Sequence, residues 1–444
     1  MSVRTPSIAC VLLACTAAPA HAALDSLAGH WEGAYGREGS IQIVHADLVA
    51  AGDSLAGTFD VPELAIRGEP LRGASGTIDS LVLRLAYGAF TMRVMPGRDE
   101  MAGVNARWNP RVTLHLKRAR PPARAVMPRE EVSFENGAVR LAGTLVLPEG
   151  AGPHPAVVIV HGSGDQGRAN GFYRSWGEWF ARRGVAALIY DKRGVGQSTG
   201  DFENATFEDL AGDVRAAVRS LRGRAGVDAA RIGLFGISQG GWVAPLAAAR
   251  GADVAFLILD VGPAVSVREQ ELDRVEYTMR ADQAAAADIE AALAYMRDVF
   301  DAAYGEAPAE PLLARAETVR AEPWSQYLDV IAMADDLEGW RRIRYDPAPV
   351  LSRTRLPLLA LFGELDVLVP PAENVEPMRR LLERAGNRDA TIRVIPGATH
   401  DMETYATLRG GEWNWPEKYW VWPRRAPEFE RAIEAWLAGH GLGR

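Results

Sequence analysis

Gly236-Ile237-Ser238-Gln239-Gly240 decides the predicted fold, because this stretch fits the pattern G-x-S-x-G. The apolar run Arg231–Phe235 precedes it, and a helix-like run, Gly241–Ala249, follows it. A strand, a sharp turn and a helix are the context in which this pattern presents a nucleophilic serine. The glycines would let neighbouring backbone approach a strained turn, and the helix start would place N–H groups beside the serine. Ser238 is therefore the predicted nucleophile; the alternative is a glycine-rich turn with an incidental serine.

Short apolar runs on both sides of this motif predict a mostly parallel sheet. They show no alternation of polar and apolar residues, which is typical of strands buried on both faces and covered by helices. A β-hairpin is expected before them, at Val132–Glu135 and Val139–Leu147. The predicted strands other than Arg231–Phe235 are Ala156–Val160, Val185–Tyr190, Val254–Leu259, Leu358–Phe362 and Thr391–Ile395.

A serine hydroxyl needs a general base to take its proton and a third group to hold that base. Where a G-x-S-x-G turn supplies the serine, the acid and then the histidine follow it along the chain. Only His400 and His440, of eight histidines, follow Ser238. His400 comes directly after the strand that ends at Ile395, whereas His440 lies among glycines near the C-terminus. His400 is therefore the predicted base.

The acid that orients this base is predicted to be Asp366. It follows the apolar strand Leu358–Phe362, so it should lie at the same edge of the sheet as the base. Glu364 is a nearby competitor, but it would lie too close to the end of the strand to reach over. Asp401, next to the predicted base, is a more distant competitor.

A tetrahedral intermediate also needs two backbone N–H donors for its oxyanion. One should be the amide of Gln239, the residue after the nucleophile. The other should come from the loop His161-Gly162-Ser163-Gly164, which follows the first predicted parallel strand. The Ser163 amide is the first choice and the Gly162 amide the alternative. His161 precedes the serine, the wrong order for a base, and we expect it to hold this loop by hydrogen bonding.

The interval between Asp260 and Leu356 contains no strand-like run. Val267–Tyr304 and Leu312–Arg342 instead have helical spacing and an alanine-rich, charged composition. A loop of this length would be unusual in a compact domain, so a helical insertion is expected at about residues 263–350. Its large apolar side chains, candidates for lining a pocket, are Trp324, Tyr327 and Trp340.

Residues 24–118 have a different pattern from the rest of the chain. Short runs in which polar and apolar residues alternate are separated by Gly, Asp and Pro. This pattern predicts antiparallel strands in a small sandwich or barrel. The opening Gly29-His30-Trp31-Glu32-Gly33 is similar to the start of lipocalin-like barrels. Residues 119–129 have the composition of a linker. The alternating runs are Ser40–Val44, Leu81–Leu85, Phe90–Val94 and Val112–Leu116.

The first 22 residues are typical of an export signal. Arg4 supplies the positive charge, Ile8–Ala18 an apolar run, and Ala20-His21-Ala22 a cleavage site of small residues. The protein is therefore expected in the periplasm or outside the cell, with no integral membrane span, since the apolar run is too short to cross a bilayer. The alternatives are an N-terminal membrane anchor, and a lipobox at Leu12-Leu13-Ala14-Cys15 that would leave Cys15 lipidated.

Composition excludes several classes of function. Both cysteines, Cys10 and Cys15, lie in the signal segment, so the mature chain would have no disulfide, no cysteine nucleophile and no cysteine-ligated metal. The formal net charge is −8, and no run of Lys and Arg tracks phosphates, so nucleic acid is not an expected partner. The oligomeric state stays open.

These motifs together resemble the α/β-hydrolase superfamily. Within it, residues 130–440 are most similar to bacterial esterases of the serine-aminopeptidase-like and prolyl-oligopeptidase-like branches. The resemblance implies an α/β-hydrolase fold with a helical cap, and hydrolysis of a small-molecule carboxylic ester through an acyl-enzyme, without metal or organic cofactor. It also implies that Asp191–Ser198 is a structural turn. The motifs are His161–Gly164, Tyr190–Ser198, Gly236–Gly241, Gly363–Pro370 and Gly397–His400.

Two other functions stay open. A peptidase or amidase would use the same triad, but no acidic or basic pair near the motifs suggests recognition of a peptide terminus. A binding protein on a hydrolase scaffold would use residues 24–118 to capture a ligand. An aromatic cluster follows His400 and either packs the C-terminal helix or lines an apolar pocket. Its members are Trp413, Trp415, Tyr419, Trp420 and Trp422. Trp176 and Trp179 are expected in the core.

Overall fold

The computed structural model describes most of the chain after the predicted signal segment. The described residues are 24–37, 40–64, 66–77, 80–85, 88–105, 111–121, 127–328, 336–404 and 424–443. The signal segment and the aromatic cluster Trp413–Trp422 lie outside them. The chain forms two compact units. The first contains the segment ending at Arg37 with Ile43–Phe59 and Pro70–Pro121, and the second contains Glu38–Gln42, Asp60–Glu69 and Pro122–Arg444.

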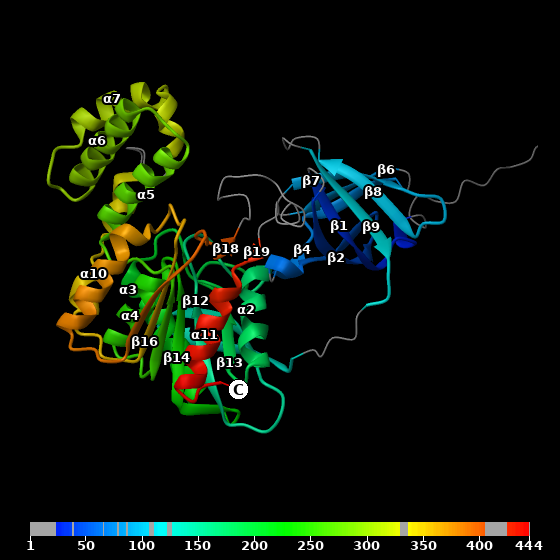
Figure 1. Ribbon diagram of the computed structural model, residues 1–444, viewed down its shortest axis with the longest axis horizontal. Helices are drawn as coiled ribbons and strands as arrows, with labels where there is room; N and C mark the ends of the chain where they lie inside the picture. Colours follow the sequence, from blue (N-terminus) through cyan, green and yellow to red (C-terminus); the bar gives the residue numbers. More distant parts are fainter. Residues whose placement is uncertain are drawn as a thin grey trace, which may run out of the picture. The chain divides into compact units, whose positions relative to one another are not determined.

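The N-terminal strands form a barrel. Their order in the sheet is β2-β1-β9-β8-β7-β6-β5-β3-β4, and an additional pairing of β2 with β3 closes it. The choice between sandwich and barrel is thus resolved by a pairing that strand patterns do not reveal. The strands are β1 (Gly29–Arg37), β2 (Ser40–Ala51), β3 (Ser54–Val61), β4 (Ile66–Pro70), β5 (Gly73–Thr77), β6 (Ser80–Leu85), β7 (Gly88–Val94), β8 (Glu100–Asn105) and β9 (Val112–Arg118) (Figure 1).

Period-two burial explains why these residues form a barrel. Alternate side chains of β7 and β9 are buried, which gives the barrel an apolar interior. Trp31 of β1 is fully buried, its indole N–H donates to the Leu27 carbonyl at 2.9 Å, and the Arg118 guanidinium lies 4.6 Å from the centre of its ring. The polar end of the indole is therefore satisfied although its body lies in the core.

The second unit is built on an eight-stranded sheet of order β10-β11-β13-β12-β14-β15-β16-β17. The hairpin of β10 and β11 is antiparallel and joins β13 antiparallel, and the strands from β13 to β17 pair in parallel. The strands are β10 (Arg129–Asn136), β11 (Val139–Val146), β12 (His154–Val160), β13 (Ala186–Tyr190), β14 (Val227–Ile237), β15 (Phe256–Asp260), β16 (Leu358–Gly363) and β17 (Ala390–Ile395). The predicted hairpin and parallel strands are present.

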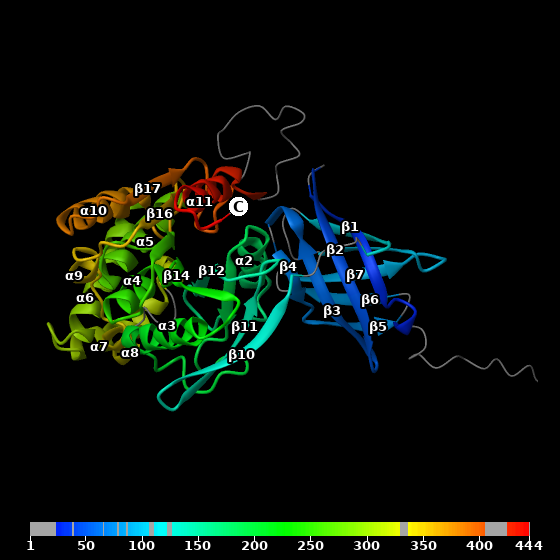
Figure 2. The ribbon, with the colours of Figure 1, turned by 90° about the horizontal axis from the view of Figure 1, so that it is seen from below.

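Helices cover both faces of this sheet (Figures 1 and 2). Side chains from successive residues of β15 enter opposite cores, since Leu257 and Leu259 pack with one set of helices and Phe256 and Ile258 with the other. This two-sided burial is why the strands are apolar throughout. The first set includes α3 (Phe207–Arg222), α4 (Gly240–Ala249) and α10 (Pro371–Arg384), and the second is α2 (Gly171–Arg182) and α11 (Pro427–Gly439). Trp176 and Trp179 of α2 lie in the second core, as predicted.

The chain between β15 and β16 is helical, as the sequence indicates. Its elements are α5 (Val267–Ala281), α6 (Ala286–Ala303), α7 (Glu310–Arg320), the 3-10 helix η2 (Pro323–Tyr327), α8 (Leu337–Arg342) and α9 (Ala348–Leu351). Trp324 and Trp340, two of the candidates for lining a pocket, are buried. Their exposed fractions are 7% and 4%, and their rings pack on those of Tyr295 and Phe300, respectively. These tryptophans fill the interior between helices that have no sheet of their own to pack on.

Helix α4 approaches the sheet without side chains between the backbones. A Cβ on Gly241 would collide with the Cα of Gly262, just beyond β15. We therefore expect Gly241→Ala to lower the free energy of unfolding by about 1–3 kcal/mol, as overpacking does. Gly223→Ala is the matched control, since nothing lies within 4 Å of its Cβ position. Urea unfolding measures both, and equal midpoints for the two variants would contradict the prediction.

Candidate active site

Ser238 lies in the turn between β14 and α4, in a backbone conformation that non-glycine residues rarely adopt. Its φ is +52°, in the left-handed region. The turn is fixed from two sides: the Ser238 N–H donates to the Asp260 carbonyl at 2.8 Å, and a Cβ on Gly240 would collide with the Val160 carbonyl. The strain is thus held by neighbouring strands on either side of β14, as expected where a side chain must be presented at a functional site.

The structure brings His400 and Asp366 to this serine. His400 Nε2 lies 3.1 Å from Ser238 Oγ, and its Nδ1 lies 2.8 Å from Asp366 Oδ2. The other oxygen of Asp366 accepts the N–H groups of Leu368 and Val369, each at 2.8 Å. Because the buried Asp366 carboxylate accepts the Nδ1 proton, Nε2 is left to accept the serine proton. The three predicted residues thus meet in the geometry of a proton relay.

The competing residues lie elsewhere. Glu364 accepts the Gly397 N–H at 2.7 Å and thereby anchors the loop that carries His400. Asp401 is exposed. His440, at the end of α11, bonds to the Trp436 carbonyl at 2.7 Å and to Asp389 at 3.1 Å. None of these three supplies a contact to the serine in the described part of the chain.

Two opposing effects set the pKa of His400. Burial alone would lower it, but the hydrogen bond and the charge of Asp366 outweigh burial, and Asp401 and Asp260 add to them. The pKa of His400 is therefore raised above its ordinary value. A raised pKa strengthens the base, but it also means that the imidazole becomes neutral, and able to take a proton, only at a higher pH.

Asp260 is a buried carboxyl group that the sequence analysis did not single out. It ends β15, is 3% exposed, and its Oδ1 has no hydrogen-bond partner in the described residues. Burial raises its pKa to about 8, against the positive charges of His400 and Arg425. A polar residue closing an apolar strand at the edge where Asp366 and His400 also lie was the signal that could have found it.

The two predicted oxyanion donors are open, and the alternative is occupied. The Gly162 N–H donates to the Tyr173 hydroxyl at 3.0 Å, which removes it as a donor. In the part of the chain that the structure describes, the N–H groups of Ser163 and Gln239 donate to no protein group. Free N–H groups at the start of α4 and in the loop after β12 can donate hydrogen bonds to an oxyanion and stabilise its charge.

His161 supports this loop by packing. Its ring lies edge-on against the rings of Tyr173 and Tyr190, at centroid distances of 4.7 and 4.6 Å. Burial first, and the charge of Lys192 second, lower the pKa of His161 to about 3. The ring is therefore neutral at physiological pH. Neither of its nitrogens has a hydrogen-bond partner among the described residues, so the expected hydrogen bonding is wrong and His161 contacts the loop by ring packing.

Comparison with known proteins identifies the family. The sequence profile described as "Serine aminopeptidase, S33" matches residues 151–404. The chain belongs to this family. Its membership, with the sheet described above, confirms the resemblance to α/β-hydrolases. In the described residues, no group of three or more His, Cys, Asp or Glu side chains is placed to hold a metal ion, and no helix has the length and hydropathy to cross a bilayer.

Individual relatives are more distant. Esterase EstD of Thermotoga maritima is 26% identical over 268 residues, which are 59% of this chain and 58% of that protein. An uncharacterized protein of Mycobacterium tuberculosis is 35% identical over 128 residues, 28% of this chain and 43% of its own length. The match thus spans little more than half of EstD and less than half of the mycobacterial protein.

Solved structures show similar chains. The esterase Pf2001 of Pyrococcus furiosus is 18% identical, with 72% of this chain and 97% of that chain covered and a TM-score of 0.44. The proline iminopeptidase-related protein of Thermus thermophilus is 23% identical, with 70% and 98% covered and a TM-score of 0.42.

The cause of the raised pKa of His400 can be tested directly. Asp366→Asn removes the negative charge but leaves the burial, so we expect the pKa of His400 to fall by more than about one unit. NMR titration of the imidazole, assigned with His400→Gln, measures it. Asp401→Asn is the control: this carboxylate is exposed and contributes less, so a smaller decrease is expected. Equal decreases in the two variants would refute the assignment to Asp366.

Proposed function

We propose that this chain is a serine esterase that cleaves carboxylic esters of small or medium acyl chains. The observation that carries the proposal is the 3.1 Å approach of His400 Nε2 to Ser238 Oγ, with Asp366 2.8 Å from the other ring nitrogen. Such a relay activates a hydroxyl for attack on a carbonyl carbon. The family membership and the naming of EstD as an esterase support the same chemistry.

In the first half-reaction, the Ser238 Oγ attacks the ester carbonyl while His400 Nε2 takes the hydroxyl proton. The carbonyl π electrons move to its oxygen, and the N–H groups of Gln239 and Ser163 stabilise that oxyanion. Collapse of the intermediate breaks the bond to the alcohol oxygen, which takes the proton from His400. The acyl group is now bonded to the serine.

In the second half-reaction, water takes the place of the alcohol. His400 accepts a proton from the water as its oxygen attacks the acyl-enzyme, and the same two N–H groups stabilise the second oxyanion. Collapse breaks the bond to Ser238 Oγ, which regains its proton from His400, and the carboxylic acid leaves. Asp366 stays ionised throughout and stabilises the imidazolium that forms in each half.

A serine peptidase or amidase using the same three residues is the second candidate. The observation in its favour is the description of the family itself, which names an aminopeptidase. Ester cleavage ranks first because the sequence near the motifs offers no acidic or basic pair to recognise a peptide terminus. The helical insertion α5 to α9 is proposed to act as a cap that selects the substrate, since it connects two strands that end at the site.

The ranking of ester over amide predicts a kinetic difference that depends on Ser238. We expect kcat/KM for short-chain p-nitrophenyl esters to exceed that for aminoacyl anilides. Ser238→Ala should abolish both activities and the labelling by a fluorophosphonate probe, because no other activated hydroxyl is proposed. Ser220→Ala, in helix α3, is the matched control and should keep both.

Three outcomes decide between the candidates. A folded wild type that neither turns over esters nor is labelled by the probe excludes a serine hydrolase. Labelling at a residue other than Ser238 excludes this nucleophile. Anilide turnover equal to or faster than ester turnover moves the peptidase to first place.

We further propose that the protein is exported to the periplasm or beyond, with residues 1–22 removed. Residues 24–118 would form a separate domain, joined by the linker 119–129 to the hydrolase domain at 130–440. The mature chain would then begin at Ala23 and contain no thiol, because Cys10 and Cys15 leave with the signal. Mass spectrometry of the exported protein measures this. A first residue Cys15 with a lipid mass, or an uncleaved N-terminus, would contradict it.

A further inference from the structure

Lys192 touches both segments that carry the open N–H donors. Its ammonium group donates to the Gly162 carbonyl at 2.6 Å, to the Gly164 carbonyl at 2.9 Å and to the Gln239 side-chain oxygen at 3.2 Å. Lys192 is the second residue after the end of β13, and it is 3% exposed. It therefore joins the loop after β12 to Gln239, the last residue before α4.

The bond to the Gly162 carbonyl bears directly on the oxyanion site. This carbonyl and the Ser163 N–H belong to one planar peptide unit, in which the C=O and the N–H point in opposite directions. Holding the oxygen therefore fixes the direction of the N–H at the other end. A cation on the oxygen also polarises the unit, which makes the N–H a stronger donor. No other hydrogen bond to the Gly162 oxygen is made in the described residues.

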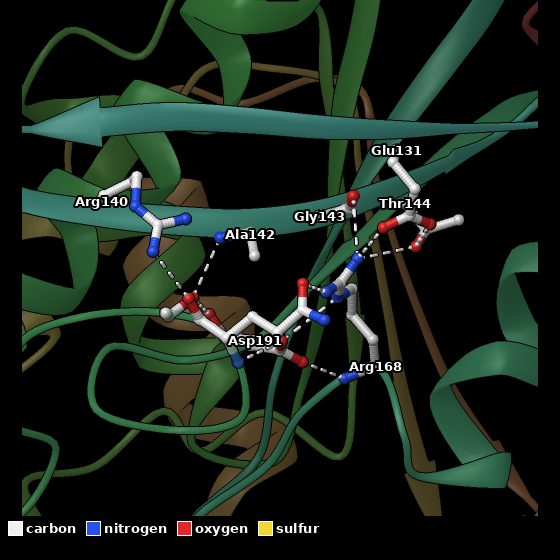
Figure 3. A network of polar contacts seen from close by, with 9 residues as sticks. Glu131, Arg140, Ala142, Gly143, Thr144, Arg168 and Asp191 are labelled. Atoms are coloured by element: carbon white, nitrogen blue, oxygen red, sulfur yellow. Dashed lines mark hydrogen bonds and ion pairs between the residues drawn. The ribbon is translucent and has the colours of Figure 1, made fainter.

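The turn that carries Lys192 is anchored independently of it. Asp191 accepts the Arg168 N–H at 2.7 Å and the Gln197 N–H at 3.0 Å, and its own carbonyl accepts the Ser198 hydroxyl at 2.7 Å. Figure 3 shows this network reaching strand β11 through Ala142, whose N–H donates to the Ser198 hydroxyl oxygen at 3.0 Å. The turn is therefore fixed to the sheet, and Lys192 projects from a rigid base.

The electrostatic surroundings of Lys192 are unusual for a buried ammonium. Among the described residues, no carboxylate lies within ion-pair distance, and its contacts are neutral oxygens and the Phe202 ring at 4.7 Å. Burial lowers its pKa to about 7, and Asp165 opposes this. The charge of Asp191 is instead shared with Arg168. A buried cation without a counter-ion is costly, and it can supply charge where an anion develops.

We propose that Lys192 is a positioning residue for the oxyanion site. It holds and polarises the Gly162–Ser163 peptide unit and fixes the side chain of Gln239, so that the two open N–H groups face one oxyanion. The inference rests on the proposed acyl transfer and deepens it. The expectation that Asp191–Ser198 is only a structural turn is thereby revised: its first residue anchors the turn, and its second acts on the site.

The test compares Lys192→Met with the wild type on a p-nitrophenyl ester, with the active fraction counted by burst titration. We expect kcat to fall by about 10- to 100-fold, less than the roughly 100- to 1,000-fold cost of removing an oxyanion donor, while KM changes less than about threefold. The affinity for an alkylboronic acid, which forms a tetrahedral anionic adduct on the serine, should fall by the same factor as kcat. Lys117→Met, on strand β9, is the control and should leave all three values unchanged.

A second variant separates positioning from folding. Lys192→Gln keeps one amide donor, so it should show the same pattern with a smaller loss. Folded variants in which kcat and boronate affinity match the wild type would overturn the proposal. So would a change confined to KM, or loss of the fold in both variants, which would make the residue purely structural. An inactive, unlabelled wild type would instead refute the proposed function, so the two failures are distinguishable.

Discussion

The direct approach of helix α4 to the backbone of two strands is the constraint on which the rest of the second unit depends. Gly240 faces the end of β12 and Gly241 faces the chain just beyond β15, with no room for a Cβ at either position. This closeness forces the turn at Ser238 into a left-handed conformation and presents its side chain at the carboxyl edge of the sheet. The loops after β12, β13, β15, β16 and β17 begin at that edge, so their polar groups converge there.

The sequence predicted the residues whose order along the chain and position after a strand follow a known pattern. Ser238, Asp366 and His400 each come after an apolar strand, and parallel strands deliver such residues to one edge. Lys192 and Asp260 stand at equivalent positions but were missed, because their roles depend on contacts across strands and on which buried groups lack partners. Closure of the barrel was unpredictable for a related reason, since the pairing of β2 with β3 is a matter of register and not of composition.

The site assembles buried charges whose effects oppose one another. Backbone N–H groups and His400 donate to the Asp366 carboxylate, whereas Asp260 has an unpartnered oxygen and its burial raises its pKa. Lys192 lies on the oxyanion side, and its charge adds to the burial that favours the neutral form of His161. The positive charge of Lys192 thus lies where the negative charge of the oxyanion would develop. The negative charge of Asp366 lies on the side of His400 that faces away from Ser238. Such preorganised polarity costs stability, which the surrounding two-sided apolar core offsets.

The edges of the two sheets differ in what they expose to other molecules. The barrel closes on itself, so it offers little unpaired backbone to a neighbouring chain. The eight-stranded sheet is open at β10 and at β17. At β10, Arg129, Glu130 and Glu131 follow one another and form ion pairs with Glu178, Arg224 and Arg168, respectively. A strand edge that begins with three charged residues resists extension by a second copy. The charges at β10 therefore guard this edge of the folded sheet against pairing with another strand.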